Sequence, residues 1–285
     1  MKVADIKRAA CVGGGVIGSS WAIQFAMRGL AVTLYDINDE QLKRSEAQMH
    51  KSLDALEQFN AITPERRGEI VAAIRLTTSM EEAVADAQFI QESGPERLEI
   101  KQSILAQVEA CAAADALYAS STSGLLISDI AAKAAHPERC VGAHPYNPPH
   151  LIPLVELTSG GKTDPALLRL AYDFYQSIGK EAVLLRRECP GFIANRLQLA
   201  LYREVQDLVM RGGVLRGGRG QGPGLRPRPA LGHLRPQHDH AAGQPRRPDR
   251  HGEYAGQLRR PLAGRHGLLD PPARQLGRGG PARRG

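Results

Sequence analysis

Features of secreted, membrane-spanning and metal-stabilised proteins are scarce in this 285-residue sequence. Its four cysteines, Cys11, Cys111, Cys140 and Cys189, are widely separated and form no CxxC pair, which argues against a zinc site or a disulfide framework. We expect each to be a small reduced core residue, and we expect no metal ion. No apolar run approaches the length of a membrane span, and the N-terminal residues lack the apolar core of a signal peptide. We therefore expect a soluble cytoplasmic protein without a membrane partner.

The net charge of +7 is unevenly distributed along the chain. Residues 212–285 contain 15 Arg, no Lys and 4 acidic residues, a net charge of +11, whereas the first 211 residues carry −4. An arginine-rich segment can bind nucleic acid by neutralising phosphates. Binding to single strands would also need aromatic side chains for base stacking, and this segment has only Tyr254. We therefore expect no nucleic-acid partner.

The same segment, 212–285, lacks most of the residue types that build a hydrophobic core. It holds 17 Gly and 10 Pro, a single Val, and no Ser, Thr, Lys, Ile, Phe, Met or Trp. Natural disordered segments are usually rich in Ser, Lys and Glu. This composition is instead typical of GC-rich DNA translated out of frame, so we expect a frameshift near Arg211 and a disordered tail after it.

The first 190 residues alternate short apolar runs with amphipathic patterns of helical period. The apolar runs predict strands over residues 8–12, 31–36, 88–93, 117–121, 139–144 and 181–186. The amphipathic patterns predict helices over 19–29, 40–59, 97–113, 164–179 and 192–210, and Thr63–Pro64 and Asp164–Pro165 are typical helix starts. This alternation predicts an α/β fold of the Rossmann type, with a doubly wound, mostly parallel sheet covered on both faces.

A GxGxxG pattern follows the first predicted strand and opens the first predicted helix. Its residues are Gly13, Gly15, Val16, Ile17 and Gly18. Glycine at these positions allows a tight turn and brings backbone amides close to a pyrophosphate, although a plain strand–helix turn is the alternative. Asp36 ends the next predicted strand, where a carboxylate accepts hydrogen bonds from ribose hydroxyls and repels a 2′-phosphate. No arginine follows Asp36 directly, so the pattern favours NAD over NADP.

Polar residues follow other predicted strands, at the sheet edge where doubly wound folds bind ligands. Ser123 lies in ASSTSGLL, where hydroxyls either face a ligand or cap the next helix. Glu96 and Lys101 open a predicted helix, where charged side chains are usually just solvated. Asn195 lies at the start of the long last helix and, taken alone, is more typical of a cap or a surface amide.

The stretch AHPYNPPHLIPLVEL places His144 ahead of four prolines and Glu156 inside an apolar run. A proline-dense segment cannot form a central strand or a helix, because proline lacks the N–H donor. The stretch is therefore either a surface loop that leads into a strand, or a rigid support for a catalytic base and the carboxylate that orients it.

Five motifs together resemble the NAD-dependent L-3-hydroxyacyl-CoA dehydrogenase family, which includes L-gulonate 3-dehydrogenase and carnitine dehydrogenase. They are GGGVIGSSWA, ESGPERLEIK, SSTSGLL, HPYNPPHLIPLVEL and PGFIANRL, in this order. The resemblance implies an oxidoreductase that uses NAD, with residues 1–188 as its NAD-binding domain. Residues 189–211 would then be the first helix of a helical second domain, which is truncated or aberrant beyond that point. The family's homodimer forms through this second domain and is in doubt here.

The resemblance also implies roles for single residues. His144 would accept the proton of the substrate's 3-hydroxyl, and Glu156 would orient its imidazole. Ser123 and Asn195 would hydrogen-bond the reacting oxygen. The positions implied to lie near the cofactor, besides the glycine-rich segment and Asp36, are Glu96, Lys101, Ser123 and Asn147. His150 matches no role in the family, so we expect it to be a surface residue.

The substrate is less strongly indicated than the family. HPYNPPHLIPLVEL is closer to the gulonate and carnitine branch, whereas Ser52 matches a serine that acyl-CoA enzymes place near the thioester substrate. We expect an L-3-hydroxyacyl-CoA that is oxidised to the 3-oxo compound, as in fatty acid metabolism. The alternatives are L-gulonate or L-carnitine as substrate, or an NAD-binding protein that is inactive.

Overall fold

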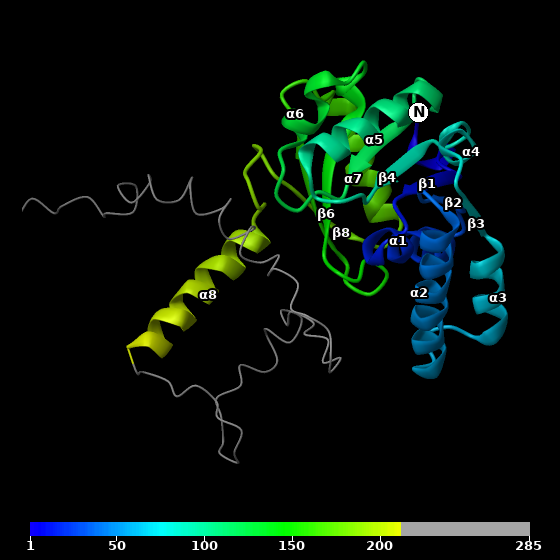
Figure 1. Cartoon of the computed structure of the whole chain (residues 1–285), viewed down its shortest axis with the longest axis horizontal. Helices are drawn as coiled ribbons and strands as arrows, with labels where there is room; N and C mark the ends of the chain where they lie inside the picture. Colours follow the sequence, from blue (N-terminus) through cyan, green and yellow to red (C-terminus); the bar gives the residue numbers. More distant parts are fainter. Residues whose placement is uncertain (212–285) are drawn as a thin grey trace, which may run out of the picture. The chain divides into compact units, whose positions relative to one another are not determined.

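An eight-stranded β-sheet forms the centre of residues 1–211, the part of the chain that the structure describes (Figure 1). The structure is a computed structural model, and the frameshift and disorder expected for residues 212–285 lie outside the described residues. The strand order is β3-β2-β1-β4-β5-β6-β7-β8. The chain therefore starts inside the sheet at β1 and extends it first in one direction and then in the other, which is the topology of a doubly wound fold.

The strands are β1 (Arg8–Val12), β2 (Ala31–Tyr35), β3 (Ile74–Thr77), β4 (Phe89–Glu92), β5 (Leu117–Ser120), β6 (Cys140–Pro145), β7 (Leu154–Ser159) and β8 (Glu181–Leu184). Neighbouring strands are parallel except β6 and β7, which are antiparallel. The predicted Rossmann-type, mostly parallel sheet is confirmed. β3, which is short, was not expected. β7 is the strand that the loop alternative for the proline-rich stretch leads into. The expectation that this stretch cannot form a central strand is wrong at both of its ends, because Pro145 only ends β6 and the other three prolines precede β7.

The helices are α1 (Val16–Met27), α2 (Asp39–Gln58), α3 (Pro64–Ala72), α4 (Met80–Val84), α5 (Leu98–Cys111), α6 (Ile127–Ile130), α7 (Pro165–Ser177) and α8 (Ala194–Met210). Short 3-10 helices span Val3–Asp5, Ala131–Lys133 and Pro137–Arg139. Thr63 and Asp164 accept hydrogen bonds from first-turn amides of α3 and α7, which confirms the two predicted proline-led starts. None of the described helices is both long and apolar enough to cross a membrane.

The sheet is buried on both faces because successive side chains of a strand point to opposite sides. In β1, Ala9 and Cys11 belong to one buried cluster, with Trp21, Phe25, Phe89 and Phe174, to which α1, α2 and α7 contribute. Ala10 and Val12 belong to a second cluster, to which α4, α5 and α6 contribute. All four cysteines are free, but only Cys11 and Cys140 are buried, so the expectation of core positions is confirmed for these two.

The chain reaches α8 through two residues in the left-handed backbone region. Gly191 has φ +77° and Phe192 has φ +52°, so the helix begins at Ala194 and not at the predicted residue 192. A continuous right-handed helix cannot include such residues. Within residues 1–211, no side chain of α8 is buried, and Leu197, Leu201 and Val205 are about half exposed.

The Gly18→Ala substitution should destabilise the fold, whereas Gly15→Ala should not. A β-carbon at Gly18 would lie 1.8 Å from the carbonyl oxygen of Gly13, a backbone atom that no rotamer change can move. A β-carbon at Gly15 would meet no atom within 4 Å, and Gly15 has a negative φ. We expect Gly18→Ala to lower the free energy of unfolding by about 2 kcal/mol or more, as overpacking does. Chemical denaturation of both variants tests this, and equal stabilities would contradict it.

Candidate active site

The glycine-rich turn between β1 and α1 forms an open cradle at the N-terminus of a helix. Gly13 has φ +97°, and a β-carbon at Gly14 would lie 2.1 Å from Ser45 Oγ, so the turn is closely packed on its inner side. A β-carbon built on Gly15, by contrast, would meet no atom within 4 Å, so this side of the turn is open. No side chain caps α1, so its first amides are available to a ligand. This cradle fits a pyrophosphate group.

Asp36 lies beside this cradle because β2 and β1 are parallel neighbours whose carboxyl ends meet. Its Oδ2 accepts a hydrogen bond from the Gly14 amide at 2.8 Å, and its Oδ1 accepts one from the Ile37 amide at 2.7 Å. The side chain is only half-buried, and a carboxylate has about four acceptor positions. Asp36 can therefore accept further hydrogen bonds from hydroxyl groups, as the sequence pattern predicts.

His144 and Glu156 are directly opposite each other in the antiparallel pair β6–β7. His144 Nδ1 lies 3.0 Å from Glu156 Oε2, and the two residues are 6% and 1% exposed. A carboxylate can only accept, so Nδ1 donates and Nε2 is left as the acceptor of the neutral imidazole. This geometry is suited to accepting a proton at Nε2 while a buried carboxylate stabilises the charge that forms.

Glu156 also contacts the start of α8. Its Oε1 accepts hydrogen bonds from the Ile193 amide at 2.8 Å and from the Ala194 amide at 3.0 Å. Phe192, just before these residues, stacks on the His144 ring with a centroid distance of 4.9 Å. The sequence pattern predicted a helix from residue 192 onwards, so the contact of Phe192 with the base was missed. Its neighbour Gly191, a glycine directly before a helix, was the available signal for a turn there.

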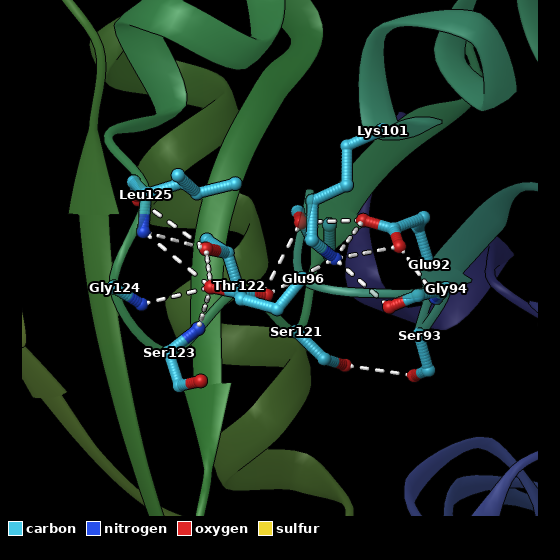
Figure 2. A network of polar contacts seen from close by, with 12 residues as sticks. Glu92, Ser93, Gly94, Glu96, Lys101, Ser121, Thr122, Ser123, Gly124 and Leu125 are labelled. Carbon is cyan, nitrogen blue, oxygen red and sulfur yellow. Dashed lines mark hydrogen bonds and ion pairs between the residues drawn. The ribbon is translucent and has the colours of Figure 1, made fainter. Parts of the chain in front are cut away.

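Glu96 organises the loop that contains Ser123 (Figure 2). Its Oε1 accepts hydrogen bonds from the Thr122 hydroxyl at 2.6 Å and from the amides of Ser123 and Gly124 at 2.9 Å each. Burial alone would raise the pKa of Glu96, but Lys101, the Thr122 hydroxyl and these two amides together lower it below the usual value. Glu96 is therefore an ionised carboxylate whose charge fixes the backbone of the Ser123 loop.

Lys101 lies between two carboxylates, as Figure 2 shows. Its Nζ is 2.8 and 3.0 Å from the two oxygens of Glu92 and 3.5 Å from Glu96 Oε2. Lys101 is 1% exposed and Glu92 is fully buried, so the alternative that the charges of this helix are simply solvated is wrong for Lys101. The Ser120 hydroxyl donates to Glu92 Oε2 at 2.5 Å. Glu92 was missed because it occupies the end of an apolar strand.

Asn195 joins the Ser123 loop to α8. Its Nδ2 donates to the Ser123 carbonyl oxygen at 3.1 Å, so the two predicted oxygen-binding residues lie together. Asn147 is exposed in the loop that follows β6. Tyr146, which precedes it, packs edge-on against His144, and its buried hydroxyl has no hydrogen-bond partner among the described residues. Within residues 1–211, no cluster of His, Cys, Asp and Glu side chains could hold a metal ion.

The expectation that His150 is a surface residue is wrong. Its Nδ1 lies 2.6 Å from the Ser20 hydroxyl of α1, and its side chain is half-buried. Burial, and secondly the charge of Lys180, lower the pKa of His150 to about 4. The reason for the error is that β6 and β7 hold the intervening loop against α1, a contact between segments 130 residues apart.

Residues 8–189 match the protein family described as "3-hydroxyacyl-CoA dehydrogenase, NAD binding domain". The chain is 44% identical to an L-carnitine dehydrogenase of Streptomyces griseus over 226 residues, 78% of this chain and 66% of that protein. It is 42% identical to an L-carnitine dehydrogenase of Pseudomonas syringae over 74% of this chain and 65% of that protein. It is also similar to (S)-3-hydroxybutyryl-CoA dehydrogenase from Ralstonia eutropha, with a TM-score of 0.70 and 27% identity over 73% of each chain. The chain spans slightly less than two thirds of these carnitine dehydrogenases.

Acid should destabilise the protein partly through His150. Its folded-state pKa of about 4 is below the unfolded value of 6.5, so the unfolded chain binds the proton first and stability falls as the pH drops from 6.5 towards 4. We expect His150→Asn to reduce this loss by about 1 kcal/mol, allowing for solvent screening of a half-buried group. Urea denaturation at pH 7 and pH 4.5 measures the loss of stability in each variant. His136→Asn, at an exposed histidine, is the control, and an equal effect of both substitutions would contradict the assignment.

Proposed function

The chain belongs to the 3-hydroxyacyl-CoA dehydrogenase family of NAD-dependent oxidoreductases, and on this premise we propose that it oxidises the 3-hydroxyl of L-carnitine to a ketone. The observation that carries the dehydrogenase activity is the buried His144–Glu156 pair. The choice of L-carnitine over the acyl-CoA expected from the sequence is supported by relatives that are 39–44% identical and are named L-carnitine dehydrogenases. Residues 1–188 are the NAD-binding domain in this proposal, and residues 189–211 begin the second domain.

In this proposal His144 is the general base. NAD, when bound, supplies the ring that accepts the hydride. Nε2 of His144 takes the hydroxyl proton, because Nδ1 already donates to Glu156. Glu156 keeps the imidazole in that tautomer and stabilises the imidazolium, an interaction strengthened by the exclusion of water from a pair so deeply buried.

Ser123 and Asn195 orient the reacting oxygen. The Asn195 amide uses one N–H on the Ser123 carbonyl, which leaves its second N–H as a donor to the substrate. Glu96 supports this arrangement, because its carboxylate binds the amides of Ser123 and Gly124. Donors held in advance stabilise charge on the oxygen without the cost of reorganising during the reaction.

NAD would be held at the carboxyl edge of the sheet. The cradle formed by Gly13, Gly15, Val16, Ile17 and Gly18 would hold its pyrophosphate. Asp36 would bind the adenosine ribose, and Asn147 would lie near the nicotinamide. Glu96 and Lys101 would lie near the cofactor, with Lys101 acting through Glu96 because it is almost fully buried.

A 3-hydroxyacyl-CoA is the second candidate substrate. It is favoured by the similarity to solved 3-hydroxybutyryl-CoA dehydrogenases, at 27–30% identity. Ser52, which resembles a serine near the thioester of acyl-CoA enzymes, lies on α2, and its hydroxyl donates to the Gln48 carbonyl at 3.1 Å. That intrahelical bond leaves the hydroxyl oxygen as an acceptor, so Ser52 does not decide between the two substrates.

A substrate panel with a base variant tests the proposal. L-carnitine, L-gulonate and L-3-hydroxybutyryl-CoA are compared by the rate of NAD reduction, and we expect the highest kcat/KM with L-carnitine. His144→Ala should lower kcat by about 10²–10⁴-fold with NADH binding unchanged, as loss of a general base does. His136→Ala, at an exposed histidine, is the control. Full activity of His144→Ala would overturn the mechanism. A higher kcat/KM with the acyl-CoA than with L-carnitine would show that the acyl-CoA is the preferred substrate.

The chain should bind NADH at least tenfold more tightly than NADPH. The Asp36 carboxylate beside the cradle would repel a 2′-phosphate. Asp36→Asn removes the charge and keeps the shape, so it should narrow the difference by improving NADPH binding. Fluorescence titration of both dinucleotides measures this, and equal affinities in the unsubstituted protein would contradict the role of Asp36.

A further inference from the structure

A buried lysine hydrogen-bonds the loop of residues 146–153 between β6 and β7. Lys180, directly before β8, is 3% exposed, and its Nζ donates to the carbonyl oxygens of Pro149 and Ile152, the latter at 2.8 Å. The same ammonium group lies 5.2 Å from the centre of the Trp21 ring of α1. The ammonium group of Lys180 therefore connects two elements. It hydrogen-bonds the loop, and it contacts the Trp21 ring of α1.

A second contact joins the same loop to the same helix. The His150 amide donates to Ser20 Oγ at 3.0 Å, and the Ser20 hydroxyl lies 2.6 Å from His150 Nδ1. Ser20 is 3% exposed and lies one turn into α1, the helix whose N-terminus forms the glycine-rich cradle. We call Lys180, Ser20 and His150 the loop anchor.

The anchor joins the element proposed for the pyrophosphate to the loop proposed for the nicotinamide. α1 begins at the cradle that fits the pyrophosphate, and the loop follows His144 and contains Asn147. Inside the loop, the amides of Leu151 and Ile152 both donate to the Pro148 carbonyl at 2.9 Å, so this part of the loop is a compact hydrogen-bonded turn. A shift of this turn relative to α1 would change the distance between the pyrophosphate and nicotinamide positions.

We propose that Lys180, Ser20 and His150 are positioning residues that set the nicotinamide position of the site relative to its pyrophosphate cradle. None of them contacts the cofactor in this proposal. They act on Asn147 through the loop, and this inference rests on the cofactor orientation given under the proposed function. The anchor therefore contributes to binding of the nicotinamide end and not to binding of the ADP-ribose end.

Binding of NADH and of ADP-ribose, which lacks the nicotinamide, separates this role from a general effect on folding. Lys180→Met keeps the apolar stem and removes the donor. The substitution leaves the carbonyl oxygens of Pro149 and Ile152 without this donor, which destabilises the loop locally. Ser20→Ala is the second variant and removes the other contact with less change of volume. Lys162→Met, at an exposed lysine of the same domain, is the matched control.

We expect each anchor variant to raise the Kd for NADH about tenfold and to leave the Kd for ADP-ribose within about twofold of the unsubstituted protein. Isothermal titration calorimetry gives both constants, and Lys162→Met should change neither. Equal losses for the two ligands would show a merely structural role, and an unchanged Kd for NADH would also overturn the proposal. Because only cofactor binding is measured, a wrong assignment of the substrate or of the base does not alter the outcome.

Discussion

Buried and half-buried carboxylates hold the parts of this site together. An ionised carboxylate removed from water must have its oxygens hydrogen-bonded, or it becomes neutral or destabilises the fold. Glu156 meets this requirement with the imidazole of His144 and two amides at the start of α8. Glu92 meets it with Lys101 and Ser120, and Glu96 with the amides of the Ser123 loop. In each case the partners come from separate segments, so satisfying the carboxylate also fixes where those segments lie.

The sheet supplies the frame that makes these partners meet. Parallel strands have their carboxyl ends at one edge of the sheet. The residues that follow β1, β2, β4 and β5 therefore lie along the same edge. The reversal between β6 and β7 allows a short loop to join the two strands, whereas parallel neighbours need a crossover of about a dozen residues or more. His144 and Glu156 are directly opposite each other in this antiparallel pair, so two groups 3.0 Å apart are close in the sequence as well.

Much of the fold was predictable because its signals are local. The glycine-rich turn, the proline-led starts of α3 and α7, and most strands depend on residues within a few positions of each other. Contacts between distant segments were not predictable in that way. The burial of Lys101 depends on Glu92 from another element, the stacking of Phe192 on His144 depends on a left-handed turn before α8, and the burial of His150 depends on α1. The roles of His144 and Glu156 were inferred from the resemblance to a family. Their position opposite each other in β6 and β7 was found only in the structure.

One carboxylate, that of Glu156, connects the catalytic pair to the start of α8. Its Oε2 fixes the imidazole of His144, and its Oε1 accepts from the first amides of the helix. A substitution that displaces the start of α8 would leave Oε1 without these two donors, and a buried carboxylate that loses its hydrogen bonds destabilises its surroundings. The precision with which the imidazole is held therefore depends on a helix that contains no part of the base.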